Sequence, residues 1–334
     1  MTHYAPHIGT KRGYHGSQTS ALGHAGCEPC MNFQQLRIIR ETARCNFNLT
    51  EVANALLTSQ SGVSKHVKDF EDELGVELFV RRGKRLLGLT DAGKEAVEIV
   101  ERMLIDAQNL AQIGGRLSSA DEGTLRIVTT HTQARYTLPP IIARFKQAFP
   151  HVRLALNQAS PRDIAAILLE GETDIGLATD TMENTTGLVT FPYYTWEHAV
   201  IVPAGHSLEQ ASPLTLEDVA EWPIITYDEG LTGRTRIDDA FAREGIVPDI
   251  AISALDADVI KSCVELGMGV GILAAMAFDP ERDTKLRRLD GARLFETNTS
   301  SLGIRRGRYL RGYVYRFIEL CSPALTEAVV RKVL

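Results

Sequence analysis

Residues 58–79 read TSQSGVSKHVKDFEDELGVELF, and this stretch decides the fold of the first part of the chain. Ser59 suits the position before a helix, because its hydroxyl can accept a hydrogen bond from a free N–H group of the first turn. Four apolar residues then recur at three- and four-residue spacing, as one buried helix face requires: Val63, Val67, Phe70 and Leu74. Gly75 follows, where a helix commonly ends. The stretch predicts a helix with one buried and one polar face.

The residues on either side of this helix complete a small module. A helix is expected from Met31, and a second, capped by Thr50, is expected to end near Thr58. Two short helices separated by about three residues are typical of a helix-turn-helix. Residues 77–80 and 85–89 are apolar and flank a basic turn that contains glycine, which predicts a β-hairpin wing.

A long helix is expected next, from the capping segment at residues 90–93 to about Leu117. Its apolar residues form a continuous stripe: Ala96, Val97, Val100, Met103, Leu104, Ala107, Leu110 and Ala111. A single long helix with such a stripe commonly pairs with its copy in a second chain. We therefore expect a linker helix that forms dimers.

From Gly123 onward, strand and helix patterns alternate, which predicts two similar α/β lobes with mostly parallel sheets. The expected fold class is α+β with several domains. The expected divisions are a disordered extension (1–30), a winged helix-turn-helix DNA-binding domain (31–90), a linker helix (91–120) and an effector-binding domain (121–334). Within the last, lobe I is expected at about 121–193 and 299–334, and lobe II at about 194–298.

Composition excludes several classes of protein. Of 334 residues, 44% are hydrophobic and 23% charged, which argues against a disordered or fibrous chain. No apolar run approaches the roughly 18–20 residues of a membrane span, and residues 1–30 lack the apolar segment of a secretory signal, so we expect a cytoplasmic protein without a membrane partner. The five cysteines are too scattered for a disulfide framework, and Cys27 and Cys30 lack the second pair that a structural zinc site needs.

The net charge of −6 hides an uneven distribution that favours DNA binding by one module. Residues 31–90 hold nine Lys or Arg and seven Asp or Glu, whereas residues 121–334 hold 22 and 29. The N-terminal side chains of a second helix-turn-helix helix reach base edges in the major groove, and basic hairpin residues suit phosphates or a narrow minor groove. The candidate DNA-binding residues are Gln60, Ser61, Ser64, Lys65, Lys68, Arg81, Arg82 and Lys84. In the acidic half, we expect the basic segment 305–308 to be a solvated face or a subunit contact.

A ligand site is expected where the strands of the α/β lobes end. Ligands of open α/β sheets bind beyond the carboxyl ends of the strands, close to helix N-termini. Neutral hydrogen-bond donors at these positions could bind a small oxyanion and still release it, as a sensor must. The same residues could equally be helix caps and strand ends. The candidates are Thr130, Thr132, Gln133, Thr179 and Thr232.

Enzymatic activity is not expected. No phosphate-binding glycine motif follows a strand, and no nucleophile elbow is present. His131 stands between two threonines without nearby residues at ligand spacing, so we expect it to be packed or hydrogen-bonded. No catalytic residue, metal or cofactor is predicted.

The motifs as a whole resemble those of LysR-type transcriptional regulators. The resemblance rests on residues 58–65, 70–79 and 89–93 and extends over residues 31–334. The second half is similar to the CysB branch of that family, which controls sulfur assimilation, through TTHTQARY at 129–136, DADVIK at 256–261 and GLTGR at 230–234. Ser61 departs from the proline that CysB-like proteins tend to carry there, and serine suits a first helical turn equally well.

The resemblance implies a two-lobed effector domain like that of periplasmic binding proteins, whose inducer pocket is lined by the five residues named above. It implies sulfate-like anions, acetylated serine or adenylyl sulfate as inducers, and promoter DNA and RNA polymerase as partners of a homodimer or homotetramer. The expected function is regulation of genes for sulfur and cysteine metabolism. Two alternatives stay open: a LysR-type regulator of another pathway with a different inducer, and a solute-binding protein.

Overall fold

The computed structural model describes residues 31–83, 85–114, 122–179, 182–231, 233–291 and 293–334. The expected extension at residues 1–30 and the end of the linker helix lie outside these ranges. The chain divides into two compact units, residues 1–101 and 102–334, with the division inside one long helix. Among the described residues, none of the helices has the length and apolar character to cross a membrane.

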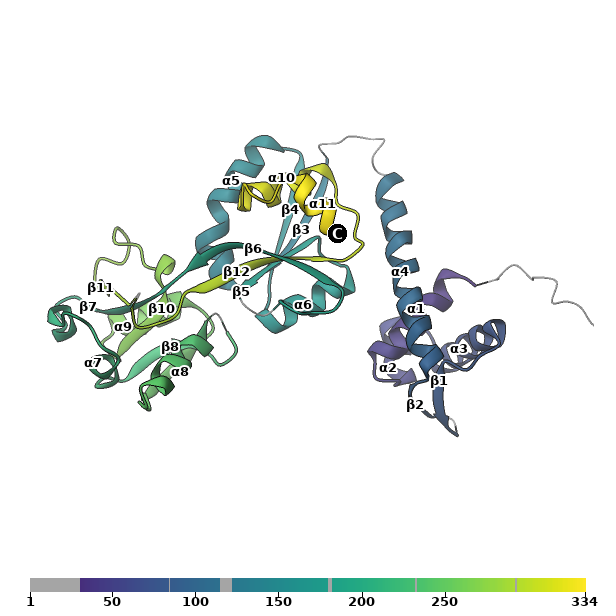
Figure 1. Cartoon of the computed structure of the whole chain (residues 1–334), viewed down its shortest axis with the longest axis horizontal. Helices are drawn as coiled ribbons and strands as arrows, with labels where there is room; N and C mark the ends of the chain where they lie inside the picture. The colour runs from purple at the N-terminus through teal and green to yellow at the C-terminus, as the bar shows by residue number, and fades with distance from the viewer. Residues whose placement is uncertain (1–30, 84, 115–121, 180–181, 232, 292) are drawn as a thin grey trace, which may run out of the picture. The chain divides into compact units, whose positions relative to one another are not determined.

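The first unit is a winged helix-turn-helix. Its elements are α1 (Phe33–Arg44), α2 (Leu49–Ala55), α3 (Gln60–Leu74), β1 (Phe79–Arg82), β2 (Arg85–Leu89) and the start of α4 (Asp91–Gly114) (Figure 1). Ser59 accepts a hydrogen bond from the N–H of Gly62 at 3.1 Å, and Gly75 ends α3 in the left-handed conformation, so both predicted signals are confirmed. The prediction of Thr50 as the cap of α2 is wrong. Asn48 caps that helix, since its Oδ1 accepts from the N–H of Thr50 at 3.1 Å.

The buried face of the third helix differs from the prediction at two positions: Leu74 is exposed and Glu71 is buried. Leu74 is 40% exposed, whereas Val63, Val67 and Phe70 are buried as predicted. The Glu71 side chain instead turns inward, and its Oε1 accepts the backbone N–H groups of Leu78 and Phe79 at 2.8 and 3.1 Å. Buried N–H groups need acceptors, and a carboxylate is a strong one. Glu71 therefore fixes the start of the wing to α3.

The second unit contains two five-stranded sheets in two lobes (Figure 1). Lobe I comprises β3 (Gly123–Thr129), η2 (Gln133–Thr137), α5 (Leu138–Ala148), β4 (Val152–Gln158), α6 (Pro161–Glu170), β5 (Ile175–Thr179), β6 (Leu188–Trp196), β12 (Asn298–Arg305), α10 (Gly312–Cys321) and α11 (Glu327–Val333). Lobe II comprises β7 (His198–Pro203), η3 (Ser207–Gln210), α7 (Leu216–Ala220), β8 (Ile224–Tyr227), α8 (Arg234–Arg243), β9 (Ile250–Ala254), α9 (Ala257–Glu265), β10 (Val270–Ala274), η4 (Ala275–Ala277) and β11 (Leu286–Leu289).

Each sheet is half parallel and half antiparallel, which corrects the expectation of mostly parallel sheets. The orders are β4-β3-β5-β12-β6 in lobe I and β11-β7-β10-β8-β9 in lobe II. Strand β12 runs antiparallel to both β5 and β6, and β7 runs antiparallel to both β10 and β11. The reason is connectivity: the chain leaves lobe I between β6 and β7 and returns at β12, so these strands are not part of βαβ units.

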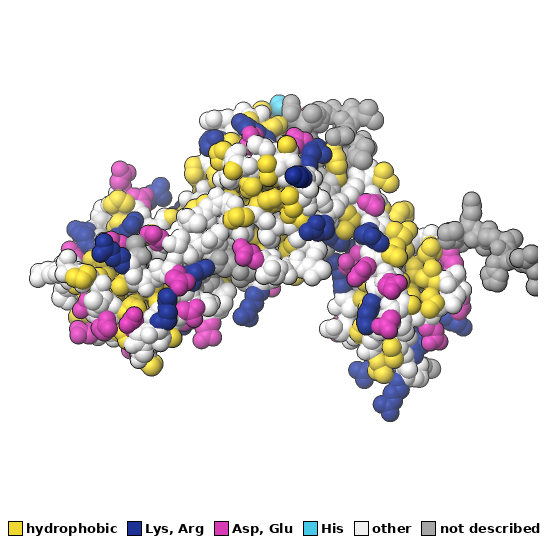
Figure 2. Space-filling model, viewed as in Figure 1, with side chains coloured by type: hydrophobic (Ala, Val, Ile, Leu, Met, Phe, Trp, Pro, Cys, Tyr) yellow, Lys and Arg dark blue, Asp and Glu magenta, His cyan; other side chains and the backbone are white. Residues whose placement is uncertain are grey.

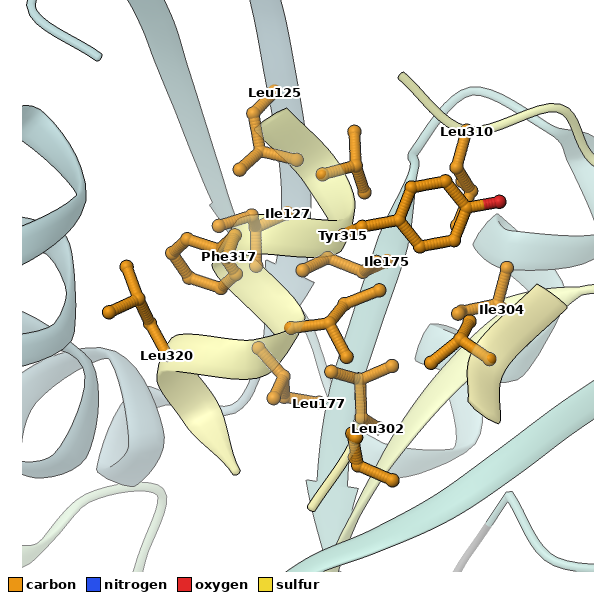
Figure 3. Close-up of a cluster of buried hydrophobic side chains, with 14 of the residues drawn as sticks. Leu125, Ile127, Ile175, Leu177, Leu302, Ile304, Leu310, Tyr315, Phe317 and Leu320 are labelled. Carbon is orange, nitrogen blue, oxygen red and sulfur yellow. The ribbon is translucent and has the colours of Figure 1, made fainter. Parts of the chain in front are cut away.

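A buried apolar core holds lobe I together. Figure 3 shows side chains of three neighbouring strands packed with α10: Leu125, Ile127, Ile175, Leu177, Leu302, Ile304 and Phe317. Each is 0% exposed, and burying such a side chain contributes about 1.5–3 kcal/mol. Because β3, β5 and β12 share this core, the residues at the ends of these strands are held in fixed positions.

In the basic segment at 305–308, expected to be a solvated face or a subunit contact, Arg306 is exposed, but two of the arginines are not solvated. Arg305 and Arg308 are buried, and the Arg308 guanidinium pairs with the Asp174 carboxylate at 2.7 Å. It also donates to the carbonyl oxygen of Gly171 at 2.6 Å. A buried guanidinium needs such partners, and the sequence spacing does not reveal a carboxylate more than 130 residues away.

Candidate DNA-binding surface and effector site

The outer face of α3 carries the predicted base-reading residues. Gln60, Ser61, Ser64, Lys65 and Lys68 are all exposed on it. Val63 and Val67 anchor the opposite face in the core, so the polar face is free to enter a groove. The Ser61 Oγ lies 3.2 Å from the Ser59 Oγ at the helix start. The geometry is suited to contact base edges and adjoining phosphates.

The wing places further cations beside this face. Arg82 and Arg85 are exposed on β1 and β2, and Figure 2 shows Lys and Arg side chains projecting at the end where these strands turn. Arg81 differs, because its guanidinium forms an ion pair with Glu71. Arg81 therefore stabilises the position of the wing, in addition to any contact that it makes with a DNA phosphate. Lys84 lies outside the described residues.

Four of the predicted effector residues meet at the carboxyl ends of β3 and β5. Thr130, Thr132, Gln133 and Thr179 are each no more than 5% exposed. Strands β3 and β5 are parallel neighbours, which brings their ends together. Thr232 lies outside the described residues.

A chain of buried hydrogen bonds fixes Gln133 and Thr179. Tyr193 Oη donates to Gln133 Oε1 at 2.6 Å, and Gln133 Nε2 donates to Ser300 Oγ at 2.9 Å. The Ser300 Oγ lies 3.2 Å from Thr179 Oγ1, which also accepts from the Trp196 indole at 3.3 Å. Gln133 is thus an orienting residue, whose amide is engaged on both sides within the protein.

Thr132 reaches from lobe I to lobe II. Its side chain is hydrogen-bonded to Tyr227, whose hydroxyl also accepts the N–H of Ala274 at 3.1 Å. Burial raises the pKa of Tyr227 to about 12, so the phenol stays neutral at physiological pH. This contact joins the start of η2 to the end of β8 without any charge.

A charged contact joins the lobes beside it. Tyr136 Oη donates to Asp258 Oδ1 at 2.6 Å, and the same carboxylate pairs with Arg135 and Lys261, each at 3.4 Å. Partial burial raises the pKa of Asp258, but the Tyr136 hydrogen bond and the two cations outweigh it and lower that pKa overall. Asp258 is therefore ionised at neutral pH and attracts η2 towards α9.

His131 lies next to this contact rather than alone. Its Nδ1 lies 3.1 Å from Gln158 Oε1, and its ring forms a group with Asp256 and Asp258 whose possible ligand atoms lie within 4.8 Å of one another. Since Asp258 already serves two cations and a phenol, we interpret this group as an interlobe contact.

Several buried polar atoms at this place have no hydrogen-bond partner among the described residues. They are Thr130 Oγ1, His131 Nε2, His198 Nε2 and Asn298 Oδ1. Sequence reasoning missed His198, Asn298, Ser300 and Tyr193. Unpaired buried polar atoms are uncommon in native proteins, so each calls for an explanation such as a ligand.

Comparisons with known proteins agree with this organisation. Residues 33–94 match the family model "Bacterial regulatory helix-turn-helix protein, lysR family", and residues 118–326 match "LysR substrate binding domain". The chain is 56% identical over 300 residues to the HTH-type transcriptional regulator SsuR of Burkholderia cenocepacia, covering 90% of this chain and 97% of that protein. It is 47% identical over 304 residues to CysB of the same organism, covering 91% and 97%.

A solved structure is similar to the second unit. The crystal structure of the cofactor-binding domain of the Cbl transcriptional regulator superposes with a TM-score of 0.61 at 51% identity, covering 64% of this chain and 93% of that one. Family models span both units, and the relatives cover nearly the whole chain. The chain belongs to the LysR family of transcriptional regulators, in its CysB-like branch, and is not an enzyme.

Proposed function

We propose that this regulator controls genes of sulfur and cysteine metabolism and responds to a small anionic, sulfur-containing inducer. Promoter DNA would be bound through α3 and the wing, and the inducer between the lobes. The regulator would act in the cytoplasm, where chromosomal DNA is found. The likeness to SsuR, Cbl and CysB supports the sulfur assignment.

The observation that carries the inducer proposal is the unpartnered, buried Thr130 hydroxyl beside Thr179. Neutral hydroxyl donors can hold an oxyanion by charge-assisted hydrogen bonds, each worth about 1.5–3 kcal/mol. A cation at the same place would hold an anion more tightly and release it more slowly. A sensor must release its ligand as the concentration falls, so neutral donors fit the task.

The response would be a shift between lobe arrangements. A ligand that contacts both lobes favours the arrangement in which both sets of contacts are made. That shift would change the spacing of paired DNA-binding modules and thereby the recruitment of RNA polymerase. Pairing through α4 is supported by the exposed apolar side chains of Ile99, Met103 and Leu110, which a second copy of α4 would bury in a dimer or tetramer.

The test is the substitution Thr130→Val, which replaces the hydroxyl by a methyl group of similar size. The purified chain would be titrated calorimetrically with sulfate, thiosulfate, O-acetylserine, N-acetylserine and adenylyl sulfate. We expect at least one of these to bind and T130V to weaken it about 10-fold or more, with promoter affinity unchanged. Thr190→Val, a half-buried threonine on β6, is the matched control and should change neither.

Binding that T130V leaves unaltered would refute the pocket assignment. An alternative of another class, a solute-binding protein without DNA affinity, predicts that no duplex is bound at any salt concentration. Salt-dependent binding to operator DNA separates the two, because phosphate contacts release counterions.

A further inference from the structure

Asn109 on α4 is hydrogen-bonded through both ends of its amide to a turn of lobe I. Its Nδ2 donates to the carbonyl oxygen of Gly307 at 2.9 Å, and its Oδ1 accepts the N–H of Tyr309 at 2.8 Å. All three residues belong to the second unit of the chain. The turn at residues 306–309 follows β12 directly. Asn109 therefore attaches the second half of α4 to the end of that strand.

The 306–309 turn is itself fixed to lobe I by charged hydrogen bonds. The Arg308 guanidinium pairs with the Asp174 carboxylate at 2.7 Å and donates to the carbonyl oxygen of Gly171 at 2.6 Å. The other oxygen of Asp174 accepts the N–H of Arg126 on β3 at 2.8 Å. Charged hydrogen bonds are roughly twice as strong as neutral ones. The turn should therefore move with the strands of lobe I, to which α4 is bound more weakly through Asn109.

Two neighbouring strands connect this turn with the proposed anion site. Strand β5 follows Asp174 directly and ends at Thr179, whereas β12 carries Ser300 near its start and ends at Arg305. The two strands pair antiparallel, with Ser300 opposite Thr179. From Ser300 to Arg305 the strand extends about 17 Å. Each strand thus has an anion-site residue at one end and the turn, or its ion-pair partner, at the other.

The two strands are packed so that they move together. Figure 3 shows Ile175 and Leu177 of β5 in the same buried core as Leu302 and Ile304 of β12. Each of these side chains is fully buried. Closely packed interiors have low compressibility and transmit strain. A displacement of β5 and β12 at the anion site should therefore reach the 306–309 turn.

The Asn109 contact can be made or broken at low cost. Gly307 is exposed, and Asn109 and Tyr309 are half-buried. Water can replace each hydrogen-bond partner when the contact opens, so that no polar atom is left buried and unpaired. Energetic coupling between distant sites needs an element of this kind, with two discrete arrangements that both sites can bias.

We propose that Asn109 is a positioning residue that relays inducer binding from lobe I to the linker helix. An inducer at Thr130 and Thr179 shifts β5 and β12, these strands move the 306–309 turn, and the turn changes the balance between the paired and the hydrated state of Asn109. Helix α4 continues into the first unit, so this balance acts on the DNA-binding module. The inference rests on the proposed function and assigns the route by which that site is regulatory.

The experiment measures amide hydrogen exchange in residues 102–114 of the purified full-length chain. Exchange is compared without a probe and with saturating sulfate, thiosulfate, O-acetylserine, N-acetylserine or adenylyl sulfate, and calorimetry shows which of these probes bind. For a probe that binds, we expect exchange in this segment of the wild-type chain to change by about fivefold or more, as is typical of coupled sites.

The variant Asn109→Ala locates the relay. It should bind the same probe within about twofold of the wild-type affinity, because the anion-site residues are unaltered, whereas the probe should change exchange in residues 102–114 by less than about twofold. Asn157→Ala, an exposed asparagine on β4, is the matched control and should keep the full response. Loss of the response with binding intact is a result that a purely structural role of Asn109 does not predict. Thermal melting establishes that each variant is folded.

The outcomes separate this inference from the function on which it rests. A bound probe that leaves exchange in residues 102–114 of the wild-type chain unchanged, or a full response in Asn109→Ala, would overturn the relay while leaving the inducer site intact. If none of the probes binds to the wild-type chain, the proposed inducer site fails and the relay fails with it.

Discussion

Replacing Glu71 by alanine should release the wing from α3. The change removes the acceptor of the Leu78 and Phe79 N–H groups, at 2.8 and 3.1 Å, and leaves both buried donors unpaired. Each unpaired donor costs about 1–3 kcal/mol, and the partly exposed Arg81 pair adds less than about 1 kcal/mol. The expected loss of about 3–5 kcal/mol is a large part of the stability of a small domain. Glu71→Gln keeps an acceptor and should cost about 1–2 kcal/mol.

Amide hydrogen exchange measures this loss directly. A local destabilisation of 3 kcal/mol should accelerate exchange at Leu78 and Phe79 by about 100-fold, and DNA affinity should fall as the wing loses its position. Glu73→Ala, an exposed glutamate on the same helix, is the matched control. Unchanged protection in the Glu71 variant, or equal loss in the Glu73 variant, would refute the reasoning.

The remaining predictions concern recognition, lobe contact and pH. Gln60→Ala should weaken operator binding by about 1–3 kcal/mol and change non-specific binding little, as gel shifts against both duplexes would show; equal losses would count against base reading. Asp258→Asn removes the charge that Tyr136 and two cations share, so exchange should accelerate in residues 133–137, and unaltered exchange would contradict an interlobe role. Burial lowers the pKa of His198 to about 3 in the folded chain, whereas an unfolded histidine has a pKa of about 6.5. Below pH 6.5 the unfolded chain therefore binds more protons at this side chain than the folded chain does. The free energy of unfolding should fall by about 1.4 kcal/mol per pH unit as the pH decreases towards 3. His198→Phe should remove that slope in urea titrations, and a slope that persists would speak against the buried neutral ring.

Local signals in the sequence predicted the first unit well. Ser59 and Gly75 act within one helical turn, so their effect can be read from neighbouring residues. The error at Thr50 arose because Asn48, two residues earlier, makes the same capping contact. Glu71 was not foreseen, because its partners lie beyond the end of its own helix and only the folded wing brings them near.

The second unit shows where sequence reasoning stops. The motif around Thr130 and Gln133 indicates residues at a strand end, and the structure places them there in a buried polar network. Ser300 and Asn298 come from a strand more than 160 residues later in the chain. Antiparallel pairing of that strand with β5 and β6 depends on connectivity across two lobes, which periodicity does not record.

The two passages between the lobes stand side by side, with Trp196 opposite Asn298 in the ladder that joins β6 to β12. A two-stranded ribbon resists shearing along its hydrogen bonds and bends more easily across its flat side. If the lobes open and close, bending of this ribbon across its flat side is the motion that would leave its hydrogen bonds intact. An inducer bound between the lobes, as proposed, would then act close to this bend, where a small displacement would move the far ends of the lobes furthest.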